Sequence, residues 1–231
     1  MKTALITGTS SGIGRETALV LLERGYNVIG FSRTSSGIGN PCFTEFVADL
    51  TDIALLEKNI RTILSDTGIN LLVNNAGVGY YGPHEQISPA MIHEMVTVNL
   101  EVPMVITSLL LRSLKSNHGT IVNISSVTAR KPDNTHGVAY GATKAGLSGF
   151  GTSLFAEVRK YGVRVINIHP DMTDTGLYRN ADFGICPDEG CSLSAREVAE
   201  IVVAATEAPD GMNLSDITVS PQFHRILRKP H

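Results

Sequence analysis

The chain has 231 residues, of which 42% are hydrophobic and 18% are charged, and its net charge is −3 at pH 7. This composition is typical of one globular domain that is long enough to bury a sizeable core. The slightly acidic balance gives no basic surface, so we expect no nucleic-acid partner and no anionic-membrane partner. The longest apolar runs, such as Ala18–Leu22, are far too short to cross a bilayer, and the N-terminus has no signal-peptide cleavage pattern. We expect a cytoplasmic protein.

Seven short runs rich in valine, isoleucine and leucine are predicted strands, and they are separated by segments with helical periodicity. The runs are Ala4–Thr7, Asn27–Phe31, Phe43–Ala48, Leu71–Asn74, Thr120–Ser125, Arg164–His169 and Ile217–Ser220. Most lack a strict apolar–polar alternation, which is typical of strands buried on both faces. The alternation of strands and helices predicts an α/β fold with a doubly wound parallel sheet. Ligands of such sheets bind at the carboxyl ends of the strands, so residues just after each strand are the candidate site.

The first predicted strand leads into a glycine-rich turn. Residues Thr7–Gly14 read TGTSSGIG, and a helix follows them. Glycines permit a tight turn and let the backbone approach a pyrophosphate, which then lies at the helix N-terminus. The spacing is GxxxGxG instead of the commoner GxGxxG, but its place between a strand and a helix indicates nucleotide binding. The predicted cofactor contacts here are Gly8, Ser10, Ser11, Gly12, Ile13 and Gly14.

The second and third strands supply the next candidates. The second strand ends at Ser32 and Arg33, where an acidic residue would favour NAD and an arginine accommodates the 2′-phosphate of NADP. We therefore predict NADP(H), with NAD(H) as the weaker candidate. Asp49, with Leu50 beside it, closes the third strand. Its carboxylate can accept from an adenine amino group or can cap the helix that begins near Thr51. Both interpretations stay open.

Capping signals mark several helix ends. Ser88 followed by Pro89 predicts an N-cap with proline at the first helical position. Residues Ser194–Glu197 have the pattern of a capping box. Gly25 and Gly162 each follow a helical run and precede a strand, so left-handed C-terminal caps are expected there.

Two segments break the regular pattern. Pro103 falls inside a long helical segment and is predicted to interrupt it. Residues 171–193 make a connection too long for a plain loop, and Leu177, Tyr178 and Phe183 give it an apolar character. We interpret this segment as a substrate-lid loop.

The three cysteines are Cys42, Cys186 and Cys191. An odd number without regular spacing argues against a disulfide framework. A structural zinc site needs four ligands, and no CxxC pair is present. We expect ordinary thiols and no metal site.

Six motifs occur in an order that resembles the short-chain dehydrogenase/reductase family of the ordinary single-domain type. They are Thr7–Gly14, Asn74–Gly77 (NNAG), Asn99, Asn123–Ser126 (NISS), Tyr140–Lys144 (YGATK) and His169–Thr175. The resemblance covers almost the whole chain, so we treat residues 1–231 as one dinucleotide-binding and catalytic domain. It implies a Rossmann-type sheet of about seven strands and hydride transfer between NADP(H) and the alcohol/carbonyl pair of a small molecule. It also implies a homodimer or homotetramer built on two long helices, roughly 103–116 and 140–161.

The resemblance assigns roles to particular residues. The catalytic set is Ser126, Tyr140, Lys144 and Asn99, and Asn99 is expected to hold a water that connects Lys144 to solvent. Ser125 is the minor candidate for the serine, because the run from Ser126 to Tyr140 is one residue longer than usual in the family. Further cofactor contacts are Asn75, Ala76, Gly77, Tyr140, Lys144, Pro170, Thr173 and Thr175. Asp171 stands where the family normally has glycine.

The residue types also suit this chemistry. A free tyrosine has a pKa near ~10, and a nearby cation favours its phenolate. Lys144 lies one helical turn after Tyr140, so we expect it to lower the pKa of that phenol. Tyr140 then acts as general acid in reduction and general base in oxidation. His136 and His169 fall nearby; we interpret the first as an exposed loop histidine and the second as a satisfied core or rim histidine.

Other functions were weighed against this one. A dinucleotide-binding sensor without turnover predicts a broken tyrosine or lysine, whereas both Tyr140 and Lys144 are present. Epimerases and dehydratases on this fold usually carry a larger C-terminal substrate domain than the residues after Thr175 allow. We therefore expect an NADP(H)-dependent carbonyl reductase or alcohol dehydrogenase.

Overall fold

The computed structural model describes residues 1–131, 133–223 and 225–228. Seven parallel strands form one sheet in the order β10-β6-β5-β4-β1-β2-β3. Their bounds are β1 Thr3–Thr7, β2 Asn27–Ser32, β3 Phe43–Val47, β4 Leu71–Asn74, β5 Thr120–Ile124, β6 Arg164–Pro170 and β10 Asp216–Val219. The predicted fold class is confirmed, and each predicted strand end lies within a single residue of the observed end.

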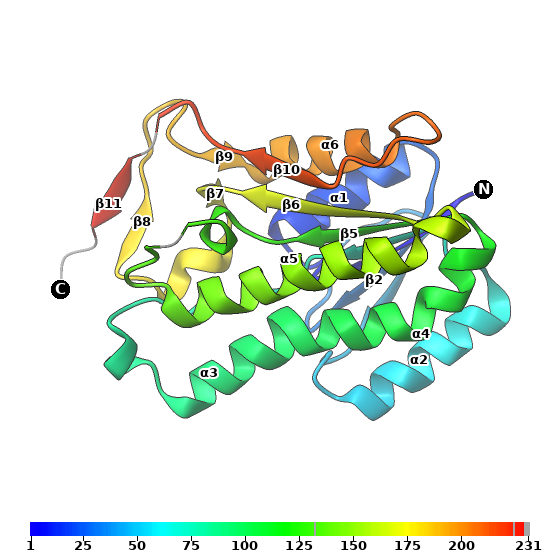
Figure 1. Cartoon of the computed structure of the whole chain (residues 1–231), viewed down its shortest axis with the longest axis horizontal. Coiled ribbons are helices and arrows are strands. Elements are labelled where there is room, and N and C mark those ends of the chain that lie inside the picture. The colour runs from blue at the N-terminus through cyan, green and yellow to red at the C-terminus, as the bar shows by residue number, and fades with distance from the viewer. Residues whose placement is uncertain (132, 224, 229–231) are drawn as a thin grey trace.

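Helices cover both faces of the sheet (Figure 1). On one face lie α1 Gly12–Glu23 and α6 Ala195–Thr206, and on the other lie α2 Ile53–Asp66, α4 Val102–Ser116 and α5 Val138–Val158. Neighbouring residues of β1 show why the strands do not alternate: Leu5 packs into the core on the α4 side, and Ile6 packs into the core on the α1 side. A strand that is buried on both faces needs apolar residues at successive positions, because these point to opposite faces of the sheet.

The predicted caps are confirmed. Ser194 and Glu197 form a reciprocal capping box at the start of α6. The Ser88 hydroxyl accepts a hydrogen bond from the backbone N–H of Met91 at the start of α3, which spans Pro89–Val96. Gly25 and Gly162 have φ angles of 78° and 73°, the left-handed conformation that ends a helix before a strand.

The expectation that Pro103 interrupts its helix is wrong. A π-helical turn, Thr97–Glu101, joins α3 to α4, and Pro103 lies in the first turn of α4. Proline is tolerated there because the wider π-turn has already changed the backbone hydrogen-bonding pattern. The helix therefore runs continuously past Pro103, and the buried Asn99 lies within the π-turn.

The run Pro89–Ser116 is also long and apolar enough to cross a membrane by length and composition. No uninterrupted apolar run in it is long, because polar residues interleave with the apolar ones. Ile106, Leu110 and Leu114 are fully buried in the core between α4 and the sheet. Packing within the protein thus accounts for the apolar composition of this helix.

The segment 171–193 is more ordered than a plain loop. It contains β7 Thr173–Asp174, the 3-10 helix η5 Gly176–Asn180 and β8 Phe183–Ile185, and it ends at β9 Leu193–Ser194. β7 pairs with β9, and β8 pairs with β11 Ile226–Arg228 near the C-terminus. Its motion as a lid stays a prediction.

Candidate active site

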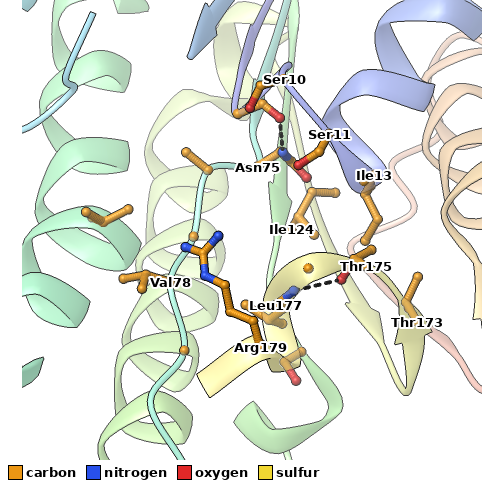
Figure 2. A pocket seen from close by; sticks show the side chains of 18 of the residues that line it. Ser10, Ser11, Ile13, Asn75, Val78, Ile124, Thr173, Thr175, Leu177 and Arg179 are labelled. Carbon is orange, nitrogen blue, oxygen red and sulfur yellow. Dashed lines mark hydrogen bonds between the residues drawn. The ribbon is translucent and has the colours of Figure 1, made fainter. Parts of the chain in front are cut away.

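A cavity of about 620 Å³ runs along the carboxyl edge of the sheet (Figure 2). It passes the end of β1, which lies between β2 and β4, so the cleft is at the point where the strand order reverses. One end is lined by Arg33 and Asp49, and the other by Tyr140 and Tyr178. The predicted residues that line it are Gly8, Ser10, Ser11, Gly12, Ile13, Ser32, Arg33, Asp49, Leu50, Asn75, Ala76, Gly77, Ser126, Tyr140, Lys144, Pro170, Thr173 and Thr175.

The glycine-rich turn forms a site suited to an anion. Gly8 and Gly12 have φ angles of 79° and 58°, a conformation that few other residues adopt. Among the described residues, no side chain caps the start of α1, and its first turn contains no acidic residue. The helix N-terminus therefore offers N–H groups and a partial positive charge to the cleft. A dinucleotide pyrophosphate fits this arrangement, and Gly12 and Ile13 are the residues that would hold it.

Gly14 is not among the residues that line the cleft, and its contact with the cofactor stays a prediction. A Cβ atom at Gly14 would lie 2.3 Å from both the Asn75 Nδ2 and the Gly8 carbonyl oxygen. The Asn75 amide donates to the Thr7 carbonyl at 2.8 Å, and the Thr7 hydroxyl accepts from the backbone N–H of Asn75 at 3.0 Å. Gly14 thus permits the β1 and β4 ends to pack together beneath the turn. Sequence reasoning assigned no role to Thr7, although it directly precedes the first glycine.

At the end of the cleft that Arg33 and Asp49 line, the Arg33 side chain is 60% exposed and lies 3.7 Å from the Glu94 carboxylate. The Asp49 carboxylate accepts from both the backbone and the hydroxyl of Thr51, which lowers its pKa. The N-cap of α2 is Asp52, so the capping role considered for Asp49 is wrong. Asp49 closes a local turn with Thr51 instead.

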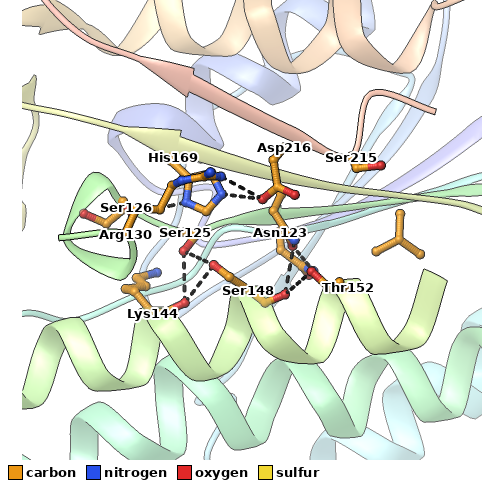
Figure 3. Close-up of polar contacts among 12 residues, drawn as sticks. Asn123, Ser125, Ser126, Arg130, Lys144, Ser148, Thr152, His169, Ser215 and Asp216 are labelled. Carbon is orange, nitrogen blue, oxygen red and sulfur yellow. Dashed lines mark hydrogen bonds and ion pairs between the residues drawn. The ribbon is translucent and has the colours of Figure 1, made fainter. Parts of the chain in front are cut away.

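The two serines after β5 point to different partners (Figure 3). The Ser125 hydroxyl lies 2.8 Å from the Ser148 hydroxyl and donates to the Lys144 carbonyl at 3.0 Å. The Ser126 hydroxyl contacts the Tyr140 oxygen and also caps the short turn that follows it. Ser125 therefore ties the strand to α5, whereas Ser126 faces the reactive end of the cleft.

Tyr140 and Lys144 are both buried on α5, at 3% exposure each. Burial raises the pKa of Tyr140 well above its usual range, and contacts with Ser126 and Tyr81 only partly oppose this. Burial also lowers the pKa of Lys144 to about 8. The Lys144 ammonium lies 5.8 Å from the centre of the Tyr140 ring and donates to the Ile124 carbonyl at 2.8 Å. The expected lowering of the Tyr140 pKa by Lys144 is thus outweighed by desolvation.

Asn99 does not line the cleft either. Its amide oxygen accepts from the backbone N–H of Val78 at 2.8 Å, and its amide nitrogen donates to the Val78 carbonyl and to the Thr143 hydroxyl. A Cβ at Gly77 would lie 3.4 Å from both the Asn99 oxygen and the Lys144 nitrogen. Asn99 therefore holds the loop after β4 next to Lys144, and its water-holding role stays a prediction.

Comparison with known proteins agrees with these motifs. A sequence profile described as short chain dehydrogenase matches residues 2–183. The chain belongs to the short-chain dehydrogenase/reductase family. An uncharacterised oxidoreductase of Staphylococcus epidermidis is 30% identical over 95% of this chain and 97% of its own length. A serine 3-dehydrogenase of Agrobacterium fabrum is 31% identical over 95% and 93%.

Among solved structures, an alcohol dehydrogenase of Thermococcus sibiricus complexed with 5-hydroxy-NADP is similar in fold. The TM-score is 0.86 with 24% identity, and the match covers 97% of this chain and 98% of that one. The similarity extends over nearly the whole length of both chains, so the Rossmann-type fold of the short-chain dehydrogenase/reductase family applies to this chain throughout.

This family member has Asp171 in place of the usual glycine. The Asp171 backbone N–H donates to the Val219 carbonyl at 2.8 Å, and its carbonyl accepts from the Thr173 hydroxyl. The turn after β6 thereby stays attached to β10. Asp171 also lines the cleft.

The two histidines occupy different surroundings. His169 is 1% exposed, with one ring nitrogen 3.2 Å from the Ser126 carbonyl and the other 2.8 Å from the Asp216 carboxylate (Figure 3). It is a satisfied core histidine, as expected, and it supports the backbone of Ser126. His136 is 53% exposed and pairs with Asp182 at 2.9 Å, so it links the loop before α5 to the segment 171–193.

Sequence reasoning missed part of the cleft wall. Val78 and Leu177 line it, and Arg179 reaches from η5 into the cleft (Figure 2). An apolar character of the segment 171–193 was recognised, but its arginine was not. The available signal for Arg179 was its charge, because it is a cationic residue in an apolar segment that follows a cofactor motif.

Cys186 and Cys191 lie together at the far end of the segment 171–193. Both thiols are free and buried, and their sulfur atoms and an Asp188 oxygen lie within 4.8 Å of one another. Burial and the neighbouring Cys186 raise the pKa of the Cys191 thiol. Asp188 is paired with Arg225 at 3.1 Å.

Proposed function

We propose that this chain is an oxidoreductase that interconverts a carbonyl and an alcohol on a small organic molecule, with NADP(H) as cofactor. The observation that carries the proposal is the contact between the Ser126 hydroxyl and the buried Tyr140 oxygen. This contact lies at one end of a cleft whose other parts fit a dinucleotide. Membership of an oxidoreductase family supports an enzymatic role.

Tyr140 is the proposed proton donor and acceptor. The bound dinucleotide supplies a hydride in reduction and accepts one in oxidation. In reduction the Tyr140 O–H bond would break and its proton would go to the carbonyl oxygen, while the carbonyl carbon would accept the hydride that the cofactor would supply. Because burial raises the pKa of Tyr140, the phenol is protonated at neutral pH and ready to act as a general acid. Ser126 donates a hydrogen bond to the same substrate oxygen.

Lys144 is the proposed partner of the phenolate that remains. With its pKa lowered to about 8 by burial, it is mostly an ammonium at pH 7. A cation at this distance from the Tyr140 ring favours the phenolate after proton transfer. Lys144 would also hold the nicotinamide ribose, and the carbonyl of Ile124 keeps its ammonium in place.

The proposal is tested by scanning ketones, aldehydes and alcohols with NADPH and NADH separately, following absorbance at the nicotinamide band. We expect turnover of at least one carbonyl–alcohol pair. Dinucleotide binding without any turnover would instead support a sensor, an alternative that the intact pair of Tyr140 and Lys144 does not favour.

The preference for NADP(H) rests on Arg33 and on the lack of an acidic residue at the end of β2. A guanidinium pairs with a phosphate through charge-assisted hydrogen bonds. We expect Arg33→Ala to weaken NADPH binding by about 10- to 100-fold and to leave NADH binding nearly unchanged. Arg61→Ala, on an exposed arginine of α2, is the matched control. Equal losses for both dinucleotides with Arg33→Ala would contradict the cofactor assignment.

We also propose a homodimer or homotetramer formed through α4 and α5. Met104 on α4 and Val138 at the start of α5 are exposed apolar residues that such contacts would cover. Light scattering coupled to size exclusion measures the mass in solution. A cytoplasmic location stays a prediction.

A further inference from the structure

Three aromatic rings gather on the side of Tyr140 that faces the proposed substrate. Tyr81 comes from the loop after β4, Tyr178 from η5 and Phe183 from β8. The Tyr81 ring centre lies 5.3 Å from that of Tyr140, 5.9 Å from that of Tyr178 and 5.2 Å from that of Phe183. Tyr178 and Phe183 are 5.5 Å apart, so Tyr81 is held between Tyr140 and a pair of rings.

The Tyr81 hydroxyl contacts the Tyr140 oxygen. Burial raises the pKa of both phenols, and this contact only partly opposes the rise at Tyr140. In the proposed oxidation of an alcohol, the substrate O–H must donate to the same Tyr140 oxygen. A substrate oxygen that reaches Tyr140 must therefore displace the Tyr81 hydroxyl.

The chain holds Tyr81 in this place through its glycines. A Cβ at Gly79 would lie 2.6 Å from the Tyr81 ring, so this ring position requires glycine there. Gly82 has a φ of 148°, and a Cβ there would meet no described atom within 4 Å. The Tyr81 ring thus packs against Gly79, and the space at the Cβ position of Gly82 is empty of described atoms.

The surroundings of the ring decide which ligand can replace it. Tyr178 and Phe183 present aromatic surfaces, and ring–ring contacts are worth more than the area they bury. Asp182, next to Phe183, pairs with the exposed His136, whereas Arg179, next to Tyr178, lines the cleft. A neutral aromatic ring recovers the contacts that Tyr81 gives up, whereas a saturated chain of equal size does not.

We propose that Tyr81 occupies an aromatic subsite, and that the substrate is an aryl ketone or aldehyde, or the matching aryl alcohol, whose ring displaces Tyr81. This inference rests on the proposed function. It adds the substrate class and assigns Tyr81 as the residue that the substrate replaces at the Tyr140 oxygen.

The first test compares two ketones that differ only in the ring, acetophenone and cyclohexyl methyl ketone, with NADPH and with NADH. Two ring contacts at usual strength favour acetophenone by at least about fivefold in kcat/KM. Equal kcat/KM values for the two ketones overturn the inference.

The second test needs no turnover. Tyr81→Ala leaves a ring-shaped space, and we expect phenol to raise its Tm more than cyclohexanol does. Tyr161→Ala, on a tyrosine that is 42% exposed in the 3-10 helix η4 Arg159–Tyr161 after α5, is the matched control and should show no such difference. Equal Tm shifts of Tyr81→Ala with phenol and with cyclohexanol overturn the inference. If no carbonyl compound is reduced but phenol still raises the Tm of Tyr81→Ala more than cyclohexanol does, the proposed function fails and the aromatic subsite stands.

A third test uses Tyr81→Phe, which keeps the ring and is available if Tyr81→Ala does not fold. Tyr81→Phe removes only the hydroxyl that competes for the Tyr140 oxygen. The KM for acetophenone is expected to fall severalfold, since the substrate no longer displaces a hydrogen bond. An unchanged or higher KM overturns the inference.

Discussion

The two ends of the cleft are built in different ways. The dinucleotide end consists mainly of backbone: the turn between β1 and α1, with glycines at positive φ and an uncapped helix start. The Tyr140 end, where the substrate is proposed to bind, is formed by side chains: Tyr81 comes from the loop after β4, and Tyr178 and Phe183 come from the segment 171–193. A backbone site suits a ligand whose shape does not vary, whereas a side-chain site can change without altering the sheet.

Tyr140 is the proposed proton donor at one end of the cleft, so its loss should have the largest effect. Tyr140→Phe removes the proton donor and keeps the ring. We expect turnover to fall by about 10²–10⁴-fold, the usual contribution of general acid–base catalysis. Steady-state rates measure this, and calorimetry with the dinucleotide shows whether the variant still binds its cofactor. Full turnover in this variant would exclude the proposed mechanism.

The two serines separate catalysis from support. Ser126→Ala removes the hydroxyl that contacts Tyr140, and we expect kcat to fall by about 10²–10³-fold, as for other donors to a developing oxyanion. Ser125→Ala loses hydrogen bonds to Ser148 and Lys144, and its kcat should fall by less than about tenfold. The reverse order of losses would make Ser125 the catalytic serine.

Gly14 tests the packing beneath the dinucleotide end. A methyl group there meets the Asn75 amide and the Gly8 carbonyl at 2.3 Å, so Gly14→Ala should lower the free energy of unfolding by about 2–3 kcal/mol. Urea denaturation measures this. Gly149→Ala in α5 is the matched control, since a Cβ there meets no described atom within 4 Å. It should be neutral or stabilise by about 0.5–1 kcal/mol, because alanine is the better helix former. Equal stability of the two variants is the contrary result.

Lys144 gives a pH dependence with a defined sign. The folded protein releases this proton near pH 8, whereas the unfolded chain keeps it until about 10.5. The unfolded state therefore binds more protons between these values, and stability rises with pH there. Below pH 8 both states are protonated, and the cost of burying the charge is fully present.

Lys144→Met removes this dependence. Between pH 7 and pH 10 we expect the wild type to gain about 2 kcal/mol of unfolding free energy relative to the variant. Urea denaturation of both proteins at the two pH values gives the difference, in which the other titrating groups cancel. Parallel pH profiles would show that Lys144 has an ordinary pKa in the folded state.

The fold was largely predictable from the sequence. The strands are continuous apolar runs and the caps use serine, proline and glycine in recognisable positions, so local patterns locate them. Pro103 shows the limit of such patterns: a π-turn ahead of it lets the helix continue, and Asn99 in that turn is hydrogen-bonded to Val78 in the loop after β4. Asp49 shows the same limit, because a carboxylate before a helix satisfied Thr51 in a turn and left the cap to Asp52.

The sequence by itself determined the sheet, the dinucleotide turn and the presence of Tyr140 and Lys144 on one helix, because these depend on periodicity and on residues close together along the chain. Only the tertiary structure decided that Ser126 faces Tyr140, that Gly14 serves packing, and that burial outweighs Lys144 in setting the pKa of the phenol. It also decided that Tyr81 meets Phe183. These outcomes depend on contacts and desolvation between distant segments, which no local pattern records.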